Sequence, residues 1–308
     1  MTVLELSLKL MLFIVAGYIA RKLKVIADGF DKMLSRFVMA IPMPCMIINS
    51  FNIEFSVDAL MDCPVLLALS IGSFTVMFAA ATLVTRKMER GVGKTLRFAL
   101  LFTNFTFLGL PVVNELYGAK GAFNYVIFTL PMRILFYGGA PMLLGRGEKL
   151  KGKELLRQFL CEPVVAVFIG FFLYVTQIRL PAVLAGAIST LGNMASPLGL
   201  ILCGIILADA DWSGMLKYRC VPVVSVLRLT VIPAVMVGAF LLLGVDKEII
   251  KTTMYFYAMP VASLLPTFLL RYDPDEVEGR VIGGYIVVVS TLLCIATVPM
   301  WALLLEKL

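Results

Sequence analysis

Two stretches inside apolar runs combine helix-breaking residues with polar side chains: TNFTFLGLP at 103–111 and MPVASLLP at 259–266. A proline removes one hydrogen bond of a helix and frees a backbone carbonyl. Within hydrocarbon, such unwound backbone persists only where it is buried in protein or faces a wet cavity. We therefore take the following residues as candidates for a binding site: Thr103, Asn104, Gly109, Pro111, Pro260, Ser263 and Pro266.

If the two stretches cross, the half-helices that follow them direct their N-terminal ends at one spot. These ends carry free N–H groups and a partial positive charge, so the spot would attract a carboxylate. The alternative is that proline and glycine only kink membrane helices for packing, which we favour for single prolines elsewhere. Those prolines are Pro131, Pro141, Pro233 and Pro299.

Three further polar residues inside apolar runs need an explanation: Arg133, Arg228 and Asn193. Arg133 stands about ten residues from either end of its run, where an arginine costs about 2.5–3.5 kcal/mol. It either clamps backbone carbonyls freed at the broken stretches or acts as the counter-charge of an anionic substrate. Arg228, nearer to the end of its run, is expected to reach the cytoplasmic headgroups with its long side chain. Asn193 either bridges two helices or joins the site.

Several kinds of catalytic chemistry are excluded by composition. The chain has no histidine, which removes Ser-His and Cys-His triads and the usual zinc sites. Its six cysteines include no CxxC pair and are expected to be structural. One acidic cluster exists, which we predict to be a solvated cytoplasmic loop: Asp273, Asp275, Glu276 and Glu278. We expect no metal, no cofactor and no enzymatic activity, because a metal-dependent intramembrane enzyme would need a second acidic cluster.

The composition places the chain in a bilayer. Hydrophobic residues make up 60% and charged residues 15% of the sequence, and the mean hydropathy is +0.96. The first apolar run follows no basic stretch and is expected to be a retained span rather than a signal peptide. The predicted spans, numbered one to ten, are Val3–Ala20, Met33–Phe51, Pro64–Val84, Leu96–Tyr117, Phe123–Leu144, Phe159–Thr176, Pro181–Leu207, Val221–Leu243, Ile249–Leu270 and Val281–Leu305.

Basic residues alternate between the two sides of these spans. The central segment 146–157 carries five lysines and arginines, whereas the loop with Glu54, Asp58 and Asp62 carries few bases. The positive-inside rule then places the central loop in the cytoplasm and both termini outside the plasma (inner) membrane. The formal charge of +7 is explained by this topology and by anionic lipid headgroups, so no nucleic-acid partner is expected.

The spans divide into two sets of five. A first repeat at 1–145 and a second at 159–308 flank the basic loop at 146–158, and an odd number of spans inverts one repeat relative to the other. Prolines interrupt spans two and seven, at Pro42, Pro44 and Pro197, and the polar broken stretches fall in spans four and nine. Broken segments in equivalent positions point to a binding site near the bilayer midplane. The fold class is therefore an all-α polytopic membrane protein with inverted repeats.

Three segments resemble the auxin efflux carrier family, which contains the plant PIN carriers and prokaryotic permeases linked to malate or malonate. They are TNFTFLGLPVVNELYG at 103–118, YAMPVASLLPTFLLRYD at 257–273 and STLLCIATVPMW at 290–301. The resemblance implies a ten-helix fold similar to sodium/proton antiporters and bile-acid symporters. Helices one, two, six and seven would form a dimerising scaffold, and helices three to five and eight to ten a transport domain that moves as an elevator.

The resemblance also implies roles for single residues. Asn104 matches the crossover asparagine of helix four, Pro260 matches the crossover proline of helix nine, and Gly109 and Pro111 match the Gly-x-Pro that follows. Thr103 stands where the plant carriers have a proline, and Pro266 lies one residue later than their second proline. With no long hydrophilic loop either, the expected substrate is a small carboxylate rather than auxin itself.

Two functional questions stay open at this point. A receptor that binds a small ligand without transporting it would have the same kind of site. Proton or sodium coupling is undecided, although Glu115 and Glu162 lie near span ends and not at midplane depth, which favours facilitated or potential-driven transport.

Overall fold

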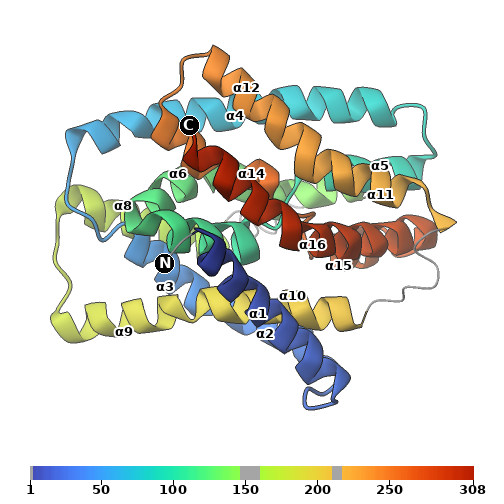
Figure 1. Ribbon diagram of the computed structural model, residues 1–308, viewed down its shortest axis with the longest axis horizontal. Coiled ribbons are helices and arrows are strands. Elements are labelled where there is room, and N and C mark those ends of the chain that lie inside the picture. Colours follow the sequence, from blue (N-terminus) through green and yellow to red (C-terminus); the bar gives the residue numbers. More distant parts are fainter. Residues whose placement is uncertain (1–2, 146–159, 210–216) are drawn as a thin grey trace. The chain divides into compact units, whose positions relative to one another are not determined.

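The computed structural model describes residues 3–145, 160–209 and 217–308, and all regular elements in this part of the chain are helical (Figure 1). The basic loop predicted at 146–158 lies outside the described residues. The first elements are α1 (Val3–Lys22), α2 (Phe30–Ala40), α3 (Pro42–Ser50), α4 (Val57–Thr85), α5 (Arg90–Leu101), the π-helix η1 (Phe105–Gly109) and α6 (Leu110–Leu144).

The other helices of the described residues follow position 160. They are α8 (Glu162–Thr176), α9 (Ala182–Asn193), α10 (Ala195–Ala208), α11 (Cys220–Val226), the π-helix η3 (Leu227–Val231), α12 (Ile232–Leu242), α13 (Lys247–Thr253), α14 (Tyr255–Ala258), α15 (Leu265–Tyr272) and α16 (Val277–Glu306).

Five helical stretches within the described residues are long and apolar enough to cross a membrane. They are Phe30–Ser50, Val57–Thr85, Ala182–Ala208, Cys220–Leu242 and Val277–Glu306, and α8 is a shorter apolar helix. The chain is thus an all-helical, multi-pass membrane protein. The full set of ten spans and the inverted repeat remain predictions.

Local sequence explains where the helices break. Predicted span two is divided at Ile41, immediately before Pro42, because the residue before a proline is pushed away from helical geometry. Gly118 adopts a positive φ of 63° inside α6 and kinks it between predicted spans four and five. Glycine reaches this conformation without the steric cost that other residues pay.

The described chain forms two compact units. The first comprises Met1–Ala68, Thr106–Leu130 and Leu160–Asp209. In it α1 packs along α10, and α3 packs against α8 and α9. A Cβ added at Gly17 would collide with the carbonyl of Ile201, and one at Gly204 with the carbonyl of Ile14. The missing side chains therefore let the backbones of α1 and α10 approach closely.

The second unit comprises Leu69–Phe105, Pro131–Phe159 and Ala210–Leu308. In it α16 packs against α5, α11 and α15. Its interior holds a cluster of aromatic rings with centroids between 4.8 and 6.1 Å apart, made of Phe98, Phe102, Phe105, Phe136, Phe256 and Phe268. Each unit draws on both halves of the chain, whereas the predicted repeats divide the chain once in the middle.

Candidate functional site

The site begins where two helices of the second unit stop. Helix α5 ends at Leu101, and Phe102 is extended, with φ −111° and ψ 128°. Helix α14 ends at Ala258, and Met259 is extended, with φ −80° and ψ 151°. Pro260 accounts for the second break, because it excludes helical geometry at the residue before it. The first break has no proline next to it.

The two unwound segments form main-chain hydrogen bonds with each other. Thr103 and Val261 form an isolated antiparallel β-bridge. The Asn104 amide donates to the Pro260 carbonyl at 2.7 Å, and the Ala262 amide donates to the Phe102 carbonyl at 3.2 Å. Pairing of this kind gives backbone groups partners where water is absent. It also explains how the crossing is held in helix four although Thr103 replaces the proline of the plant carriers.

A third helix supports the bridge. The Val261 amide donates to the Ser290 hydroxyl of α16 at 3.1 Å, and Ser290 is fully buried. The Oγ1 atoms of Thr103 and Thr106 are buried and have no hydrogen-bond partner among the described residues. Buried polar atoms of this kind are rare in native structures and call for an explanation, such as a bound ligand or water.

The other predicted site residues are placed as follows. Ser263 follows the bridge and Pro266 lies in the first turn of α15, and both are partly exposed. Gly109 ends η1 and Pro111 lies in the first turn of α6; both are buried and belong to the first unit. Asn193 ends α9, is exposed and also belongs to the first unit.

Arg133 is fully buried in the second unit. Its guanidinium lies over the ring of Phe105, 5.3 Å from the centroid, one residue after Asn104 in the chain. An arginine over an aromatic face is stabilised by the quadrupole of the ring. The structure therefore brings Arg133 to the same broken segment as Thr103 and Asn104.

Arg228 is not at a headgroup, and the prediction that its side chain reaches the membrane surface is wrong. It is fully buried, and its guanidinium donates to the carbonyl of Leu100 at 3.1 Å and to that of Phe256 at 3.4 Å. Depth along its own helix does not determine where this arginine lies, because the two broken helices bring main-chain carbonyls to it.

The backbone next to Arg228 is also unusual. Pro233 provides no N–H for the carbonyl of Leu229, four residues earlier, and the indole N–H of Trp301 donates to that carbonyl instead, at 2.7 Å. Arg228 and Leu229 both belong to the π-helix η3, and such π-turns are frequent at functional sites. An arginine five residues before a proline was the sequence signal that could have revealed this position.

Comparison with known proteins identifies the family. A family described as membrane transport protein matches residues 2–302. The chain belongs to this family. The resemblance to auxin efflux carriers is thereby confirmed over nearly the whole length. An uncharacterized transporter of Methanothermobacter thermautotrophicus is 24% identical over 313 residues, which cover 98% of each protein. Membership in this membrane transport family makes the chain a membrane transporter.

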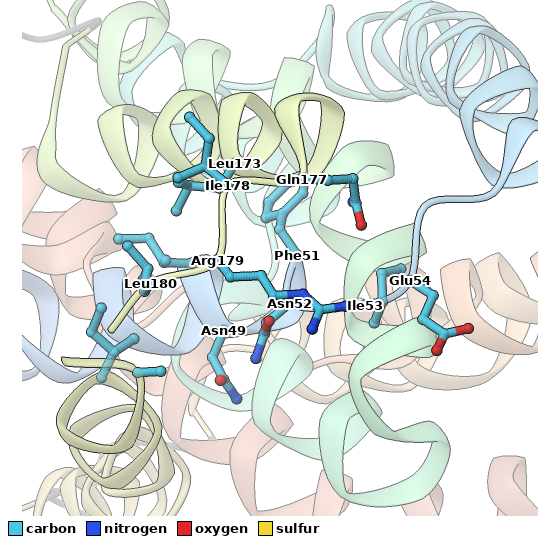
Figure 2. Close-up of a pocket in the computed structure, with 13 residues that line it drawn as sticks. Asn49, Phe51, Asn52, Ile53, Glu54, Leu173, Gln177, Ile178, Arg179 and Leu180 are labelled. Atoms are coloured by element: carbon cyan, nitrogen blue, oxygen red, sulfur yellow. The ribbon is translucent and has the colours of Figure 1, made fainter. Parts of the chain in front are cut away.

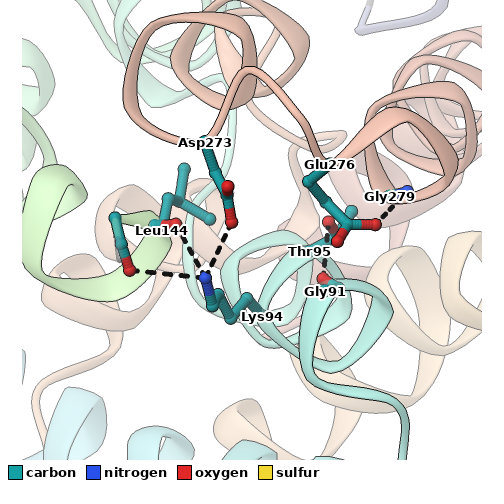
Figure 3. Close-up of polar contacts among 8 residues, drawn as sticks. Gly91, Lys94, Thr95, Leu144, Asp273, Glu276 and Gly279 are labelled. Atoms are coloured by element: carbon teal, nitrogen blue, oxygen red, sulfur yellow. Dashed lines mark hydrogen bonds and ion pairs between the residues drawn. The ribbon is translucent and has the colours of Figure 1, made fainter. Parts of the chain in front are cut away.

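In this transporter the acidic cluster after α15 is not a solvated loop throughout, so that prediction needs correction. Asp273 is only 5% exposed and pairs with Lys94 of α5 at 2.9 Å. Lys94 also donates to the carbonyls of Leu144 and Gly145 at the end of α6, as Figure 3 shows. Glu276 accepts from the Gly279 amide at 2.9 Å and caps α16. Three segments of the second unit are thus tied together by one lysine.

A cavity of about 340 Å³ lies in the first unit of the transporter, where α3 and α8 end and α9 begins (Figure 2). Its polar lining comprises Asn49, Asn52, Glu54, Gln177 and Arg179, and its wall includes apolar residues such as Ile188. Arg179 extends across it toward the segment that contains Asn52 and Glu54. None of the residues that the sequence singled out as a site lines this cavity.

Proposed function

We propose that this transporter carries a small organic anion, a malate-like or auxin-like carboxylate, with the substrate bound at the crossing of predicted helices four and nine. The observation that carries the proposal is the pairing of the two unwound segments at Thr103 and Val261 inside an apolar protein. Unwound backbone that meets at one place is the usual setting for a transporter binding site.

The surrounding groups support an anion. Arg133 supplies a buried positive charge beside the first unwound segment, and α15 starts after the second unwound segment with its positive dipole end. The buried Thr103 hydroxyl offers a donor to a carboxylate oxygen. Of the two roles considered for Arg133, these neighbours favour substrate counter-charge.

The remaining parts of the proposal follow the family resemblance. The transporter would have ten spans in two inverted repeats, both termini outside the plasma membrane, and a homodimer built on helices one, two, six and seven. The other six helices would move as an elevator between the two sides. Transport would be facilitated or driven by the membrane potential.

Counterflow in proteoliposomes tests the proposal. Purified protein is reconstituted with internal malate, malonate or indole-3-acetate, and uptake of the same labelled compound is compared with empty vesicles. At least one carboxylate should accumulate. A protein that binds a carboxylate in a thermal-shift assay but shows no counterflow would be a receptor, and transport would be rejected.

Variants of Arg133 test the site itself. Arg133→Gln should abolish carboxylate binding in a protein that remains stable in detergent, and Arg133→Lys should keep part of it, because the charge survives without the bidentate fork. Arg36→Gln removes an exposed arginine of α2 and serves as the control. Native affinity in Arg133→Gln would show that Arg133 is not the anion site.

A further inference from the structure

Arg228 lies beside the crossing without being part of any predicted site. We infer that it is a positioning residue, which ties the two broken helices together and makes the crossing selective for anions. This inference rests on the proposed function, because it assigns a role in anion transport at that site.

The two hydrogen bonds of Arg228 reach both half-helices. Leu100 is the residue before the last of α5, and Phe256 lies in the last turn before the break at Met259. One guanidinium therefore holds the end of each half-helix, at 3.1 Å and 3.4 Å. The spacing of its nitrogens fixes the two carbonyls relative to each other, and a lysine ammonium has no such planar fork.

The charge of Arg228 matters because of where these carbonyls lie. The C-terminal ends of helices carry a partial negative charge, and two such ends beside one site would repel a carboxylate. A buried cation bonded to both carbonyls offsets this repulsion. The positive N-terminal end of α15, which follows the second unwound segment, can then dominate the local electric field.

Two neighbouring aromatic rings connect Arg228 with Arg133. Arg133 lies over Phe105, Arg228 lies over Phe256 at 5.9 Å from the centroid, and these two rings are 5.7 Å apart. Because Arg228 donates hydrogen bonds to the main-chain carbonyls of Leu100 and Phe256, it acts on the substrate through backbone position and electric field. Arg133 is the arginine placed to contact the substrate.

The experiment compares carboxylates with their neutral amides. Dissociation constants are measured for malate, malonate and indole-3-acetate and for the corresponding amides, in the wild type, Arg228→Gln and Arg228→Lys. Ser225→Ala is the control, since Ser225 is buried one turn earlier and its hydroxyl donates to Val221 of its own helix. Counterflow rates are recorded for the same proteins.

Arg228→Gln should reduce the preference for carboxylate over amide by about tenfold. Arg228→Lys should keep that preference within about threefold but slow counterflow by about tenfold, because one ammonium cannot hold both carbonyls in the same geometry. Ser225→Ala should match the wild type in both measurements. A purely structural role would lower stability without changing the ratio of the two dissociation constants.

The outcomes separate this inference from the proposed function. A wild type that binds none of the carboxylates overturns both. Carboxylate binding by the wild type with an unchanged preference in Arg228→Gln overturns only the role of Arg228. If Arg228→Gln does not fold, Arg228→Lys decides alone, and loss of the preference or a native counterflow rate in that variant contradicts the inference.

Discussion

Single residues at the crossing have one role for the backbone, which forms the bridge, and another for the side chain. The amide of Asn104 holds the bridge to Pro260, while its carboxamide offers both donors and an acceptor in a position that is only 3% exposed. Thr103 likewise belongs to the β-bridge with Val261 through its backbone. Its buried hydroxyl makes no hydrogen bond to the described residues and is available to a ligand. Substitution of these side chains can therefore change function without unfolding the protein.

Asn104→Ala should leave a folded protein that has lost most transport, because alanine keeps the backbone hydrogen bond and removes only the carboxamide. Counterflow measures the loss, and an unchanged melting temperature verifies folding. Asn52→Ala, at an exposed position after α3, is the control. Unchanged uptake in Asn104→Ala would count against the crossing as the binding site.

Trp301→Phe tests how the π-helix is supported. The variant keeps an aromatic ring but leaves the buried carbonyl of Leu229 without the indole donor, which should cost about 1–3 kcal/mol. Thr230→Val removes a partly exposed hydroxyl that donates to the Val226 carbonyl one turn earlier and should change stability by less than about 0.5 kcal/mol. Equal melting temperatures for the two variants would contradict the role of Trp301.

At the scale of elements, glycines decide which helices pack closely. Gly17 faces the backbone of α10 at Ile201, whereas Gly72 of α4 has open space around its Cβ position. Gly17→Ala should therefore destabilise the protein by about 1–3 kcal/mol through overpacking. Gly72→Ala should be neutral or slightly stabilising, because alanine favours a helix. Thermal unfolding in detergent measures both, and the reverse order of stability would refute the assignment.

Ion pairs also act at this scale, because Lys94 and Asp273 join α5 to the end of α15. Their side chains are 13% and 7% exposed, so a double-mutant cycle with Lys94→Met and Asp273→Asn should give a coupling energy of at least about 1 kcal/mol. The pair Lys251 and Glu248, whose side chains are 20% and 67% exposed, should give at most about 0.5 kcal/mol. Equal coupling in the two cycles would mean that burial does not strengthen the first pair.

At the scale of the whole molecule, the distribution of charge predicts the topology. Leu150→Cys, in a background without the six native cysteines, should react with impermeant reagents only from the cytoplasm, because five bases surround position 150. Labelling of intact and permeabilised cells measures this. Reaction from outside in intact cells would overturn both the topology and the inverted repeat.

The sequence alone determined that the chain is helical and crosses a membrane, and it located the two breaks. Hydropathy, proline and glycine act on the residues next to them, and predicted spans two, three, seven, eight and ten each overlap an observed apolar helical stretch. Asn104 and Pro260 could be singled out for the same reason. The family could be recognised because its motifs are contiguous.

Only the tertiary structure decided which groups satisfy the broken backbone and the buried charges. Arg228 donates to a carbonyl 128 residues away, Lys94 pairs with a carboxylate 179 residues away, and Trp301 donates to a carbonyl 72 residues away along the chain. A local pattern shows that a carbonyl is freed or that a charge lies in an apolar run. It does not show which partner the fold brings, because hydrogen bonds and ion pairs depend on distances in space that sequence separation does not encode.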